Sequence, residues 1–529
     1  MAKFDYSMRG PAVGTNFMAS SGHPLATSVG LQMFNAGGNA FDAAVAMAAA
    51  IAVAEPAQNH LGGDAFALIR NAANGDILAL NASGPAPSLV EPTLFKDGIP
   101  IHGLRSATVP GAVAAWDLIA KTHGRLPIGQ LLEPAIEMAK QGIPVTESLH
   151  QSIVENHHSL QREKDWVDLF APFGKPLQPG EVLKQPDLAN ILAEVATGGA
   201  EAFYQGSFAE KLDAHSKRVG GLIRSSDLKN YRCEFTSPIY TTYNNYDIYG
   251  QPPVSQGYVL LSQLNMAEAL NLHEYDFGDP TNLHIMLECK KLAYKDRHRY
   301  LGDPEFVSIY MDTLLDKEFA KNRTAIFDNA HARHRNFDPV IDEGTDTTCL
   351  SAADKEGNMV TYIQSLFHAF GCGQVIRDTG VIMNNRMCGF SIDPNSPNKI
   401  EANKRPIHTL NTYMLASDGM PILIGATRGA HFQVQTNFQI ISNIVDHGMN
   451  IQEAMEAPRW SHDETDGRVL LENRFSLQSF DDLKSRGHDI HCAGSWGNPS
   501  CTQGIAVDTG NHVLLGGTDP RWHGIALGS

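Results

Sequence analysis

The segment Ala40–Ala54 constrains the fold more than any other part of the sequence, because it predicts a helix that is apolar on nearly all sides. Asn39 is a suitable N-cap and Pro56 cannot continue a helix, so both ends are defined. A helix without a polar face has to be buried, which requires a sizeable core. The chain can supply one, since 43% of its 529 residues are apolar. Its length allows about three or four ordinary domains, or one large multilayer unit.

Charge and cysteine content exclude several classes of protein. The chain has 41 Lys and Arg against 58 Asp and Glu, and the resulting net charge of −17 argues against a general nucleic-acid binder. No stretch is long and apolar enough to span a bilayer, and the N-terminus lacks an apolar signal core. The seven cysteines form no CxxC pair, which favours reduced thiols. We therefore expect a cytoplasmic protein without nucleic-acid or membrane partners.

Hydrophobic periodicity and turn residues predict a mixture of helices and strands, the α/β (α+β) class. A hairpin is expected over residues 66–70 and 77–80, and a polar loop over residues 322–343. Helices are predicted over residues 112–122, 128–140, 188–197, 258–270, 282–300, 433–446, 451–457 and 475–485. Strands are predicted over residues 238–249, 413–416, 421–424 and 512–515.

A second predicted hairpin, directly after the polar loop, carries the most specific candidate for chemistry. Its strands are residues 347–354 and 359–367, joined by the turn Lys-Glu-Gly-Asn. A symmetric turn places Thr347 opposite Leu366 and beside Ser365, to within one residue, because registers slip. The hairpin is therefore expected to bring a second hydroxyl to Thr347.

Thr347 could act as a nucleophile only if its weakly reactive hydroxyl has a base beside it. One solution is the α-amine of the same residue, which is available when the threonine is the first residue of a chain. An α-amine titrates near ~7.7–8.0, so a useful fraction is a neutral base at pH 7. Thr347 is internal, so this would require cleavage of the Asp346–Thr347 bond. The alternative is that the Thr-Thr pair serves only the β-propensity of the strand.

Ten motifs, taken in order along the chain, resemble the γ-glutamyltransferase family of N-terminal-nucleophile hydrolases over nearly the whole length. They are GGNA (37–40) with DAA (42–44), LGGD (61–64), VPGAV (109–113), KLAYKDR (291–297) with YLGDP (300–304), TT (347–348), DKEGN (354–358), NN (384–385), KRP (404–406), EAPR (456–459) and TDPR (518–521). The resemblance implies a four-layer αββα sandwich and no cofactor. It also implies a precursor that cuts itself before Thr347, into chains 1–346 and 347–529 that remain one intertwined unit.

The resemblance also implies roles for individual residues. Thr347 would attack the carbonyl of Asp346 in the precursor and a substrate amide in the mature enzyme. Ser365 falls where the family has a second threonine that bonds the nucleophile. Arg428 and Gly429 fall where the family has a Gly-Gly pair whose backbone N–H groups form the oxyanion hole.

The candidate substrate-binding residues depart from the family pattern. Arg386 stands after Asn384-Asn385 where the family has Asn or Gln, and His408-Thr409 replace a pair of serines. The arginine that holds a γ-glutamyl carboxylate and the aspartate that holds its ammonium have no counterparts, Gly389 standing at the latter position, and Phe367 replaces an asparagine and reduces the pocket volume. With no carboxylate to offset it, Arg386 would repel an α-ammonium and favour a carboxylate. The alternative for Arg386 is a structural ion pair.

We therefore expect an amidohydrolase for a small acidic amide, with Asn385, Arg386, His408 and Thr409 binding the substrate. Within the family these features are most similar to oxamate amidohydrolases, which split oxamate into oxalate and ammonia in purine-ring nitrogen salvage. The alternatives are a γ-glutamyl hydrolase or transpeptidase for glutathione-like substrates, an acylase for larger amides, and an uncut homologue that binds without catalysis. A dimer of the two-chain unit is also considered. No metal is expected, because the spacing His331-x-x-His334 has no partnering cluster.

Overall fold

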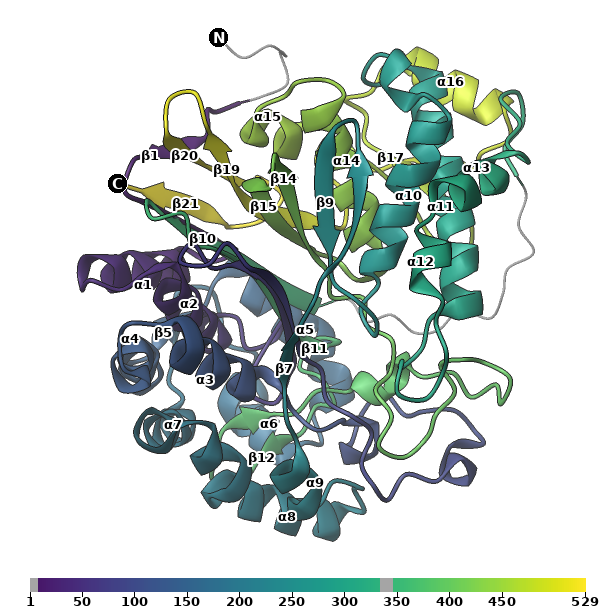
Figure 1. Cartoon of the computed structure of the whole chain (residues 1–529). Coiled ribbons are helices and arrows are strands. Elements are labelled where there is room, and N and C mark those ends of the chain that lie inside the picture. Colours follow the sequence, from purple (N-terminus) through teal and green to yellow (C-terminus); the bar gives the residue numbers. More distant parts are fainter. Residues whose placement is uncertain (1–7, 334–345) are drawn as a thin grey trace.

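Two β-sheets face each other at the centre of the molecule, and two groups of helices cover their outer sides (Figure 1). The computed structural model describes residues 8–333 and 346–529. Strands β3, β10 and β11 of one sheet pack against β14, β15 and β19 of the other. This α-β-β-α layering confirms the four-layer α+β sandwich that the resemblance implies.

The first sheet is antiparallel and has seven strands, and the hairpin predicted around Thr347 forms its middle. In spatial order its strands are β21 (Ile525–Gly528), β2 (Phe17–Ser21), β10 (Asp346–Asp354), β11 (Met359–Phe367), β3 (Asp64–Arg70), β4 (Ile77–Ala82) and β7 (Glu234–Thr236). Both neighbours of the β10–β11 hairpin thus come from the part of the chain before residue 346.

The second sheet is also antiparallel with seven strands, and it too combines early and late parts of the chain. In spatial order its strands are β1 (Ala12–Gly14), β20 (Val513–Thr518), β19 (Cys501–Asp508), β15 (Met420–Arg428), β14 (Thr412–Ser417), β9 (Tyr246–Gly250) and β8 (Ile239–Tyr243).

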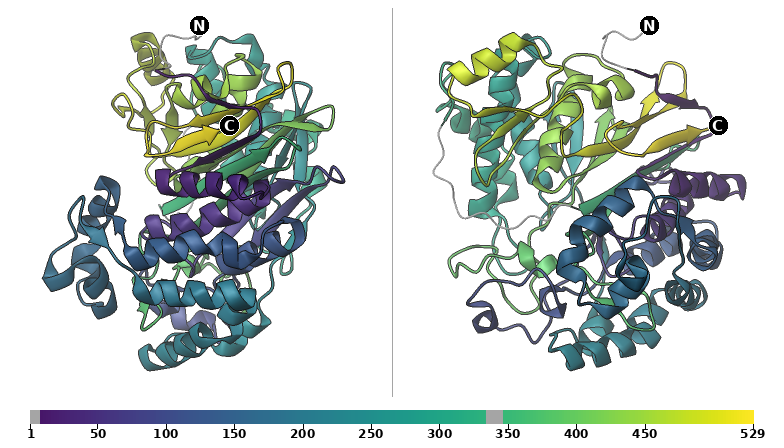
Figure 2. Two further views of the ribbon diagram at one scale, coloured as in Figure 1. Left: turned by 90° about the vertical axis from the view of Figure 1, so that its left-hand side faces the viewer. Right: turned by 180° about the vertical axis from the view of Figure 1, so that it is seen from behind.

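Each sheet has its own helical layer. The first sheet is covered by α1 (Pro24–Asn35), α2 (Ala40–Ala54), α3 (Ala112–His123), α4 (Ile128–Gln141) and α7 (Pro186–Gln205), with α5 (Glu147–Leu160), α6 (Lys164–Phe170), α8 (Ser207–Val219) and α9 (Ser225–Asn230) further out. The second is covered by α10 (Gly257–Ala269), α11 (Pro280–Tyr300), α14 (Gln433–Val445) and α15 (Ile451–Glu456), with α12 (Met311–Leu314), α13 (Lys317–Thr324) and α16 (Leu477–Ser485) beyond. The α5–α6 region projects from the rest of the molecule (Figure 2). No helix in the described ranges is long and apolar enough to cross a membrane.

Short two-stranded and three-stranded sheets lie outside the two main ones. They consist of β5 (Ile143–Pro144) with β6 (Val182–Leu183), β12 (Val375–Ile376) with β13 (Val381–Ile382), and β16 (Trp460–His462) with β17 (Val469–Leu471) and β18 (Ile490–Cys492).

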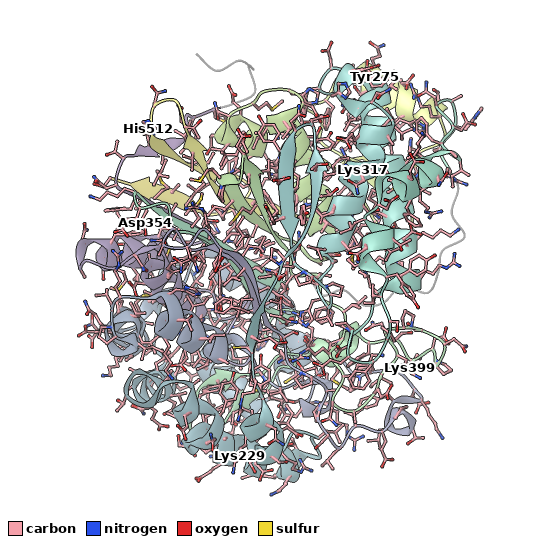
Figure 3. The ribbon with its side chains drawn as sticks, viewed as in Figure 1. Lys229, Tyr275, Lys317, Asp354, Lys399 and His512 are labelled. Atoms are coloured by element: carbon pink, nitrogen blue, oxygen red, sulfur yellow. The ribbon has the colours of Figure 1, made fainter. Side chains whose placement is uncertain are left out.

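Helix α2 confirms the prediction made from its apolar sequence. All 15 of its residues are buried, because it packs on α1, α3 and α4 on one side and on β10 and β11 on the other. Asn39 caps its N-terminus, and Asp42 completes a capping box by accepting from the Asn39 backbone N–H. At the far end of β10, Asp354 (labelled in Figure 3) accepts a hydrogen bond of 3.0 Å from the backbone N–H of Ala40. The helix is thus tied to the strand that begins at Thr347.

The register of the β10–β11 hairpin lies one residue from the predicted one, within the expected tolerance. Thr348 pairs with Gln364, whereas Asp346 pairs with Phe367, so a β-bulge separates the two pairs. Thr347 is the one residue of β10 that faces two residues of β11, Ser365 and Leu366, across this bulge. A bulge bends a strand and redirects its side chains.

The other predicted elements are present with altered ends. The strand expected over residues 238–249 is two strands, β8 and β9, because Asn244 and Asn245 adopt positive φ angles and make a tight turn. The segment α7 is longer than residues 188–197 and consists of two helical stretches separated by a kink at Gly199, whose φ of +63° is not helical. Of the polar loop, residues 322–324 close α13, and residues 334–343 lie outside the described ranges.

Candidate active site

The predicted nucleophile and its predicted partner meet at the start of β10. Thr347 is buried, with 2% of its surface exposed. The Ser365 hydroxyl donates a hydrogen bond of 2.6 Å to the carbonyl oxygen of Asp346 and accepts one of 2.8 Å from the backbone N–H of Phe367. Ser365 therefore contacts the peptide bond that the predicted cleavage would break.

The predicted oxyanion turn lies across the gap between the two sheets from Thr347. The Cys349 thiol donates to the carbonyl of Ala426 at 3.2 Å, so the start of β10 faces the end of β15. Arg428 is the last residue of β15 and pairs with Cys501 in the sheet. The turn itself is made by the next two residues, Gly429 and Ala430, whose φ angles are +117° and +50°.

The predicted Arg428–Gly429 pair thus consists of the last residue of β15 and the first residue of this turn. Its role as an oxyanion hole stays a prediction. The Arg428 side chain packs on the face of Trp522, with its guanidinium carbon 3.6 Å from the centre of the ring.

Arg386 lies beside the Thr347 end of the hairpin, fully buried. Its guanidinium carbon is 4.4 Å from the centre of the Phe367 ring, and its Nε donates to Oδ2 of Asp64 at 3.0 Å. Asp64 is the cross-strand partner of Ser365. The expectation that no carboxylate offsets Arg386 is therefore wrong, because Asp64 is paired with it.

This ion pair uses only one edge of the guanidinium. Nη1 and Nη2 of Arg386 are both buried and make no hydrogen bond to the described residues. Both oxygens of Asp64 are occupied, since Oδ1 accepts from the backbone N–H of Gly84 at 2.9 Å. Burial raises the pKa of Asp64, while the positive charge of Arg386 opposes that rise. What remains for a ligand is a pair of parallel N–H donors, the arrangement that binds a planar carboxylate.

His408 is a second buried polar residue near Arg386. Its ring packs edge-on against Phe66, with 5.0 Å between centroids, and Phe66 is two residues from Asp64 on the same face of β3. Both ring nitrogens are buried and without hydrogen bonds to the described residues. Burial, together with the charges of Arg386 and Arg405, holds the pKa of His408 well below 6.5. The imidazole is therefore neutral at pH 7 and offers one donor and one acceptor.

The remaining predicted binding residues have local partners. The Asn385 amide donates to the carbonyl of Ile101 at 3.1 Å and contacts the His368 ring at 2.8 Å, while its oxygen accepts from the His368 backbone. The backbone carbonyl of Thr409 accepts from the Gln256 side chain at 2.7 Å. Asn385 therefore shapes the loop before Arg386, and Thr409 is tied to the loop that leads into α10.

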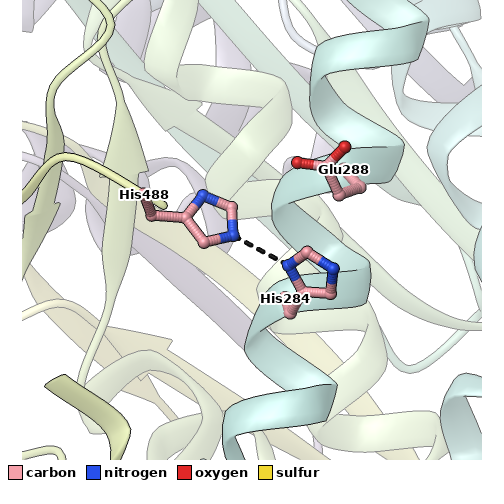
Figure 4. A group of neighbouring side chains, drawn as sticks. All are labelled: His284, Glu288 and His488. Atoms are coloured by element: carbon pink, nitrogen blue, oxygen red, sulfur yellow. Dashed lines mark hydrogen bonds between the residues drawn. The ribbon is translucent and has the colours of Figure 1, made fainter. Parts of the chain in front are cut away.

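A buried cluster of His284, Glu288 and His488 was not indicated by the sequence motifs (Figure 4). The two imidazoles are 2.8 Å apart, nitrogen to nitrogen, and His284 also bonds the carbonyl of Asp328 at 2.8 Å. Two nitrogens on one tetrahedral zinc ion would stand about 3.3 Å apart. Lys291 lies 2.8 Å from Glu288 and 3.3 Å from His488. The short nitrogen–nitrogen distance and the nearby Lys291 ammonium group therefore indicate a hydrogen-bond network rather than a zinc site.

His331, from the other considered metal spacing, is exposed and bonds Asp328 at 3.1 Å. Its companion His334 lies outside the described ranges. The expectation of no metal stays a prediction.

Known proteins resemble this chain over almost all of its length. Residues 26–529 match the family model described as Gamma-glutamyltranspeptidase. The glutathione hydrolase-like YwrD proenzyme of Bacillus subtilis (strain 168) is 35% identical, over 98% of this chain and 100% of its own. The oxamate amidohydrolase proenzyme of Klebsiella pneumoniae is 32% identical, over 98% of this chain and 100% of its own.

Among solved structures, cephalosporin acylase from Bacillus halodurans superposes with a TM-score of 0.92 at 34% identity, covering 100% of this chain and 98% of the acylase. The names of these proteins indicate different substrates, so similarity alone does not identify the substrate of this chain.

Proposed function

The chain belongs to the gamma-glutamyltranspeptidase family of hydrolases that act on amide bonds, and on this premise we propose that it is a self-processing amidohydrolase for a small carboxylate-bearing amide. The substrate that we propose is oxamate, split into oxalate and ammonia. The two mature chains would be residues 1–346 and 347–529. The proposal includes a cytoplasmic location, which is supported by the seven cysteines, all free of disulfides.

Self-cleavage is supported by the contacts of the Asp346–Thr347 peptide bond. The Ser365 hydroxyl already donates to the Asp346 carbonyl oxygen, so it polarises this carbonyl. The Thr347 hydroxyl attacks the carbonyl carbon, the C–N bond breaks, and the nitrogen gains the proton that the hydroxyl loses. Water then hydrolyses the resulting ester, which leaves a carboxylate on Asp346 and a free α-amine on Thr347.

Turnover would use the group that cleavage sets free. The α-amine of Thr347 takes the proton from its own hydroxyl, whose oxygen attacks the substrate amide carbon. The N–H groups of the turn at Gly429 and Ala430 face the developing oxyanion. Ammonia leaves with the proton returned by the amine, and water hydrolyses the threonyl ester to release the acid.

The observation that carries the substrate proposal is the free edge of Arg386. Two buried guanidinium nitrogens without partners among the described residues are costly unless an anion binds them. Phe367 covers the face of the guanidinium and Asp64 occupies its Nε, so a carboxylate can approach only Nη1 and Nη2. Neutral His408 beside them adds a hydrogen-bonding group without a second charge.

The second candidate is a γ-glutamyl hydrolase or transpeptidase, and Asp64 is the observation that favours it. An α-amino acid needs an anion for its ammonium as well as a cation for its carboxylate, and the site holds both Asp64 and Arg386. Each Asp64 oxygen already accepts one hydrogen bond, however, so an ammonium would have to share these oxygens with Gly84 and Arg386. This favours the acidic amide.

The test is an ammonia-release assay on purified protein with oxamate, its neutral analogue oxamide, and glutathione with glutamate detection. We expect turnover of oxamate, little with oxamide, and little with glutathione. Edman sequencing of the same sample should give a second N-terminus reading Thr-Thr-Cys. Turnover of glutathione alone would replace the proposed substrate with the second candidate, and a single uncut chain would support a binding homologue.

A further inference from the structure

We propose that Glu55 is a positioning residue, which holds the Thr347-Thr348 end of β10 in place for both self-cleavage and turnover. Glu55 directly follows the last residue of α2, and its side chain is buried against the start of β10. The inference rests on the proposed function, because Glu55 would act through the nucleophile. Nothing in the expected chemistry of the family motifs uses this carboxyl group.

The two oxygens of Glu55 have different surroundings. Oε1 accepts a hydrogen bond of 2.9 Å from the indole N–H of Trp522. Oε2 is buried and accepts none from the described residues, although the Thr348 hydroxyl is close enough to lower the pKa of the carboxyl group. A Cβ placed on Gly22 would lie 3.4 Å from Oγ1 of Thr348 and 3.9 Å from Oε2 of Glu55. Oγ1 of Thr348 and Oε2 of Glu55 therefore border one small space beside Gly22.

Trp522 connects the carboxyl group to the other half of the site. The same ring whose N–H binds Glu55 carries the guanidinium of Arg428 on its face, at 3.6 Å. Arg428 immediately precedes the turn at Gly429 and Ala430. The three side chains of Glu55, Trp522 and Arg428 thus form a continuous series of contacts. This series joins the strand that bears the nucleophile to the turn proposed to bind the oxyanion.

The charges around Glu55 are consistent with a carboxyl group that binds its neighbours. Burial raises its pKa, while the charges of Arg428 and His523 and the hydrogen bonds from Trp522 and Thr348 lower it. A buried carboxylate oxygen without a donor is costly. We infer that the Thr348 hydroxyl, which borders the same space as Oε2, is the donor that this oxygen uses, before the cut as well as after it.

The experiment compares variants that keep or remove these hydrogen bonds. Glu55→Gln keeps the size and an acceptor for Trp522, and its amide can bond the Thr348 hydroxyl, whereas Glu55→Leu removes all polar contacts. We expect Glu55→Leu to lower kcat and the rate of self-cleavage by about 10- to 100-fold, and Glu55→Gln by less than about 5-fold. KM should stay within about 2-fold in both, because the substrate is bound elsewhere.

Two substitutions of Thr348 form a second pair of variants. Thr348→Val should behave like Glu55→Leu, and Thr348→Ser should behave like the wild type. Glu288→Gln is the matched control, a buried carboxyl group in the network of Figure 4, and it should leave kcat unchanged.

The thermal midpoint of every variant shows whether it folds. A folded Glu55→Leu variant with normal kcat and normal cleavage would overturn the inference, while the proposed function would stand. Equal loss in Glu55→Gln and Glu55→Leu with a matching rise in KM would also overturn it, because that pattern marks a general structural role. An uncut, inactive wild-type chain would overturn the proposed function and this inference with it.

Discussion

At the scale of single residues, the proposed mechanism requires Thr347 twice, first to cut the chain and then to cut the substrate. Thr347→Ala should leave one uncut chain without amidase activity, because no hydroxyl remains to attack Asp346. Denaturing electrophoresis should show a single band near the full mass of 57.6 kDa. Thr347→Ser keeps a hydroxyl and should still be cut.

Ser365→Ala is the companion variant. It should slow cleavage without abolishing it, by about 10- to 1000-fold if Ser365 acts as an oxyanion-type donor. Two bands from purified Thr347→Ala would show that another nucleophile cuts the chain.

Arg386 should affect substrate binding far more than processing. Arg386→Ala removes the free Nη pair, and KM for a carboxylate-bearing amide should rise by about 10- to 100-fold. Self-cleavage should change little, because Ser365 bonds the Asp346 carbonyl whereas Arg386 bonds Asp64. Arg386→Lys is the control, since it keeps a charge for Asp64 but lacks the parallel donors. If the rate of self-cleavage falls by the same factor by which KM rises, Arg386 is a structural residue.

The site could be predicted from the sequence where its residues follow from one local pattern. Thr347 and Ser365 lie on the two strands of one hairpin, β10 and β11, so strand pairing alone brings Ser365 to Thr347. Asp64 and Glu55 could not be found this way. Asp64 meets Arg386 across 322 positions, and Glu55 meets Trp522 across 467, so only the packing of whole layers joins them.

At the scale of elements, the cap of α2 should contribute to stability in proportion to its hydrogen bonds. Asn39 accepts from the backbone N–H groups of Phe41 and Asp42. Asn39→Ala should lower the free energy of unfolding by about 1 kcal/mol, measured by denaturant titration of the Thr347→Ala chain. Asn39→Ser keeps a capping acceptor and should lose less. A loss well above about 2 kcal/mol would mean that the hydrogen bond from the Asn39 amide to the His123 carbonyl, 2.8 Å long, contributes substantially as well.

The elements themselves were predictable to the extent that their patterns are local. Apolar character on all sides of Ala40–Ala54 leaves burial as the only outcome for α2. The turn between β8 and β9 was missed because Asn244 and Asn245 interrupt a Tyr- and Thr-rich run without Gly or Pro. The exact position of the turn after β15 could not be predicted, because Ala430 takes a positive φ that its side chain disfavours.

At the scale of the whole molecule, buried neutral histidines should make stability fall on acidification. Burial lowers the pKa of His60 to about 3 from 6.5, so between these values the unfolded chain binds more protons than the folded one. Stability therefore decreases as pH falls through this window, by up to about 1.4 kcal/mol per pH unit for one such group. His23 and His462, with pKa values lowered to about 4, act in the same direction.

The measurement is the pH dependence of unfolding between about pH 4 and 6.5 for His60→Gln and the wild type, both in the Thr347→Ala background. The variant should show the flatter slope, because glutamine binds no proton yet can still accept from the backbone of Ile382. His273→Gln, at an exposed position, is the control and should leave the slope unchanged. Identical slopes for His60→Gln and the wild type would contradict the assignment.

Both sheets contain strands from before and after residue 346, and this shared construction has a consequence for the gene as well as for the chemistry. A cut before Thr347 would release neither fragment, because β10 and β11 would remain hydrogen-bonded between β2 and β3. Fragments made separately would expose unpaired strand edges, which promote aggregation. We therefore expect both fragments to be encoded in one reading frame and to fold while they are still one chain.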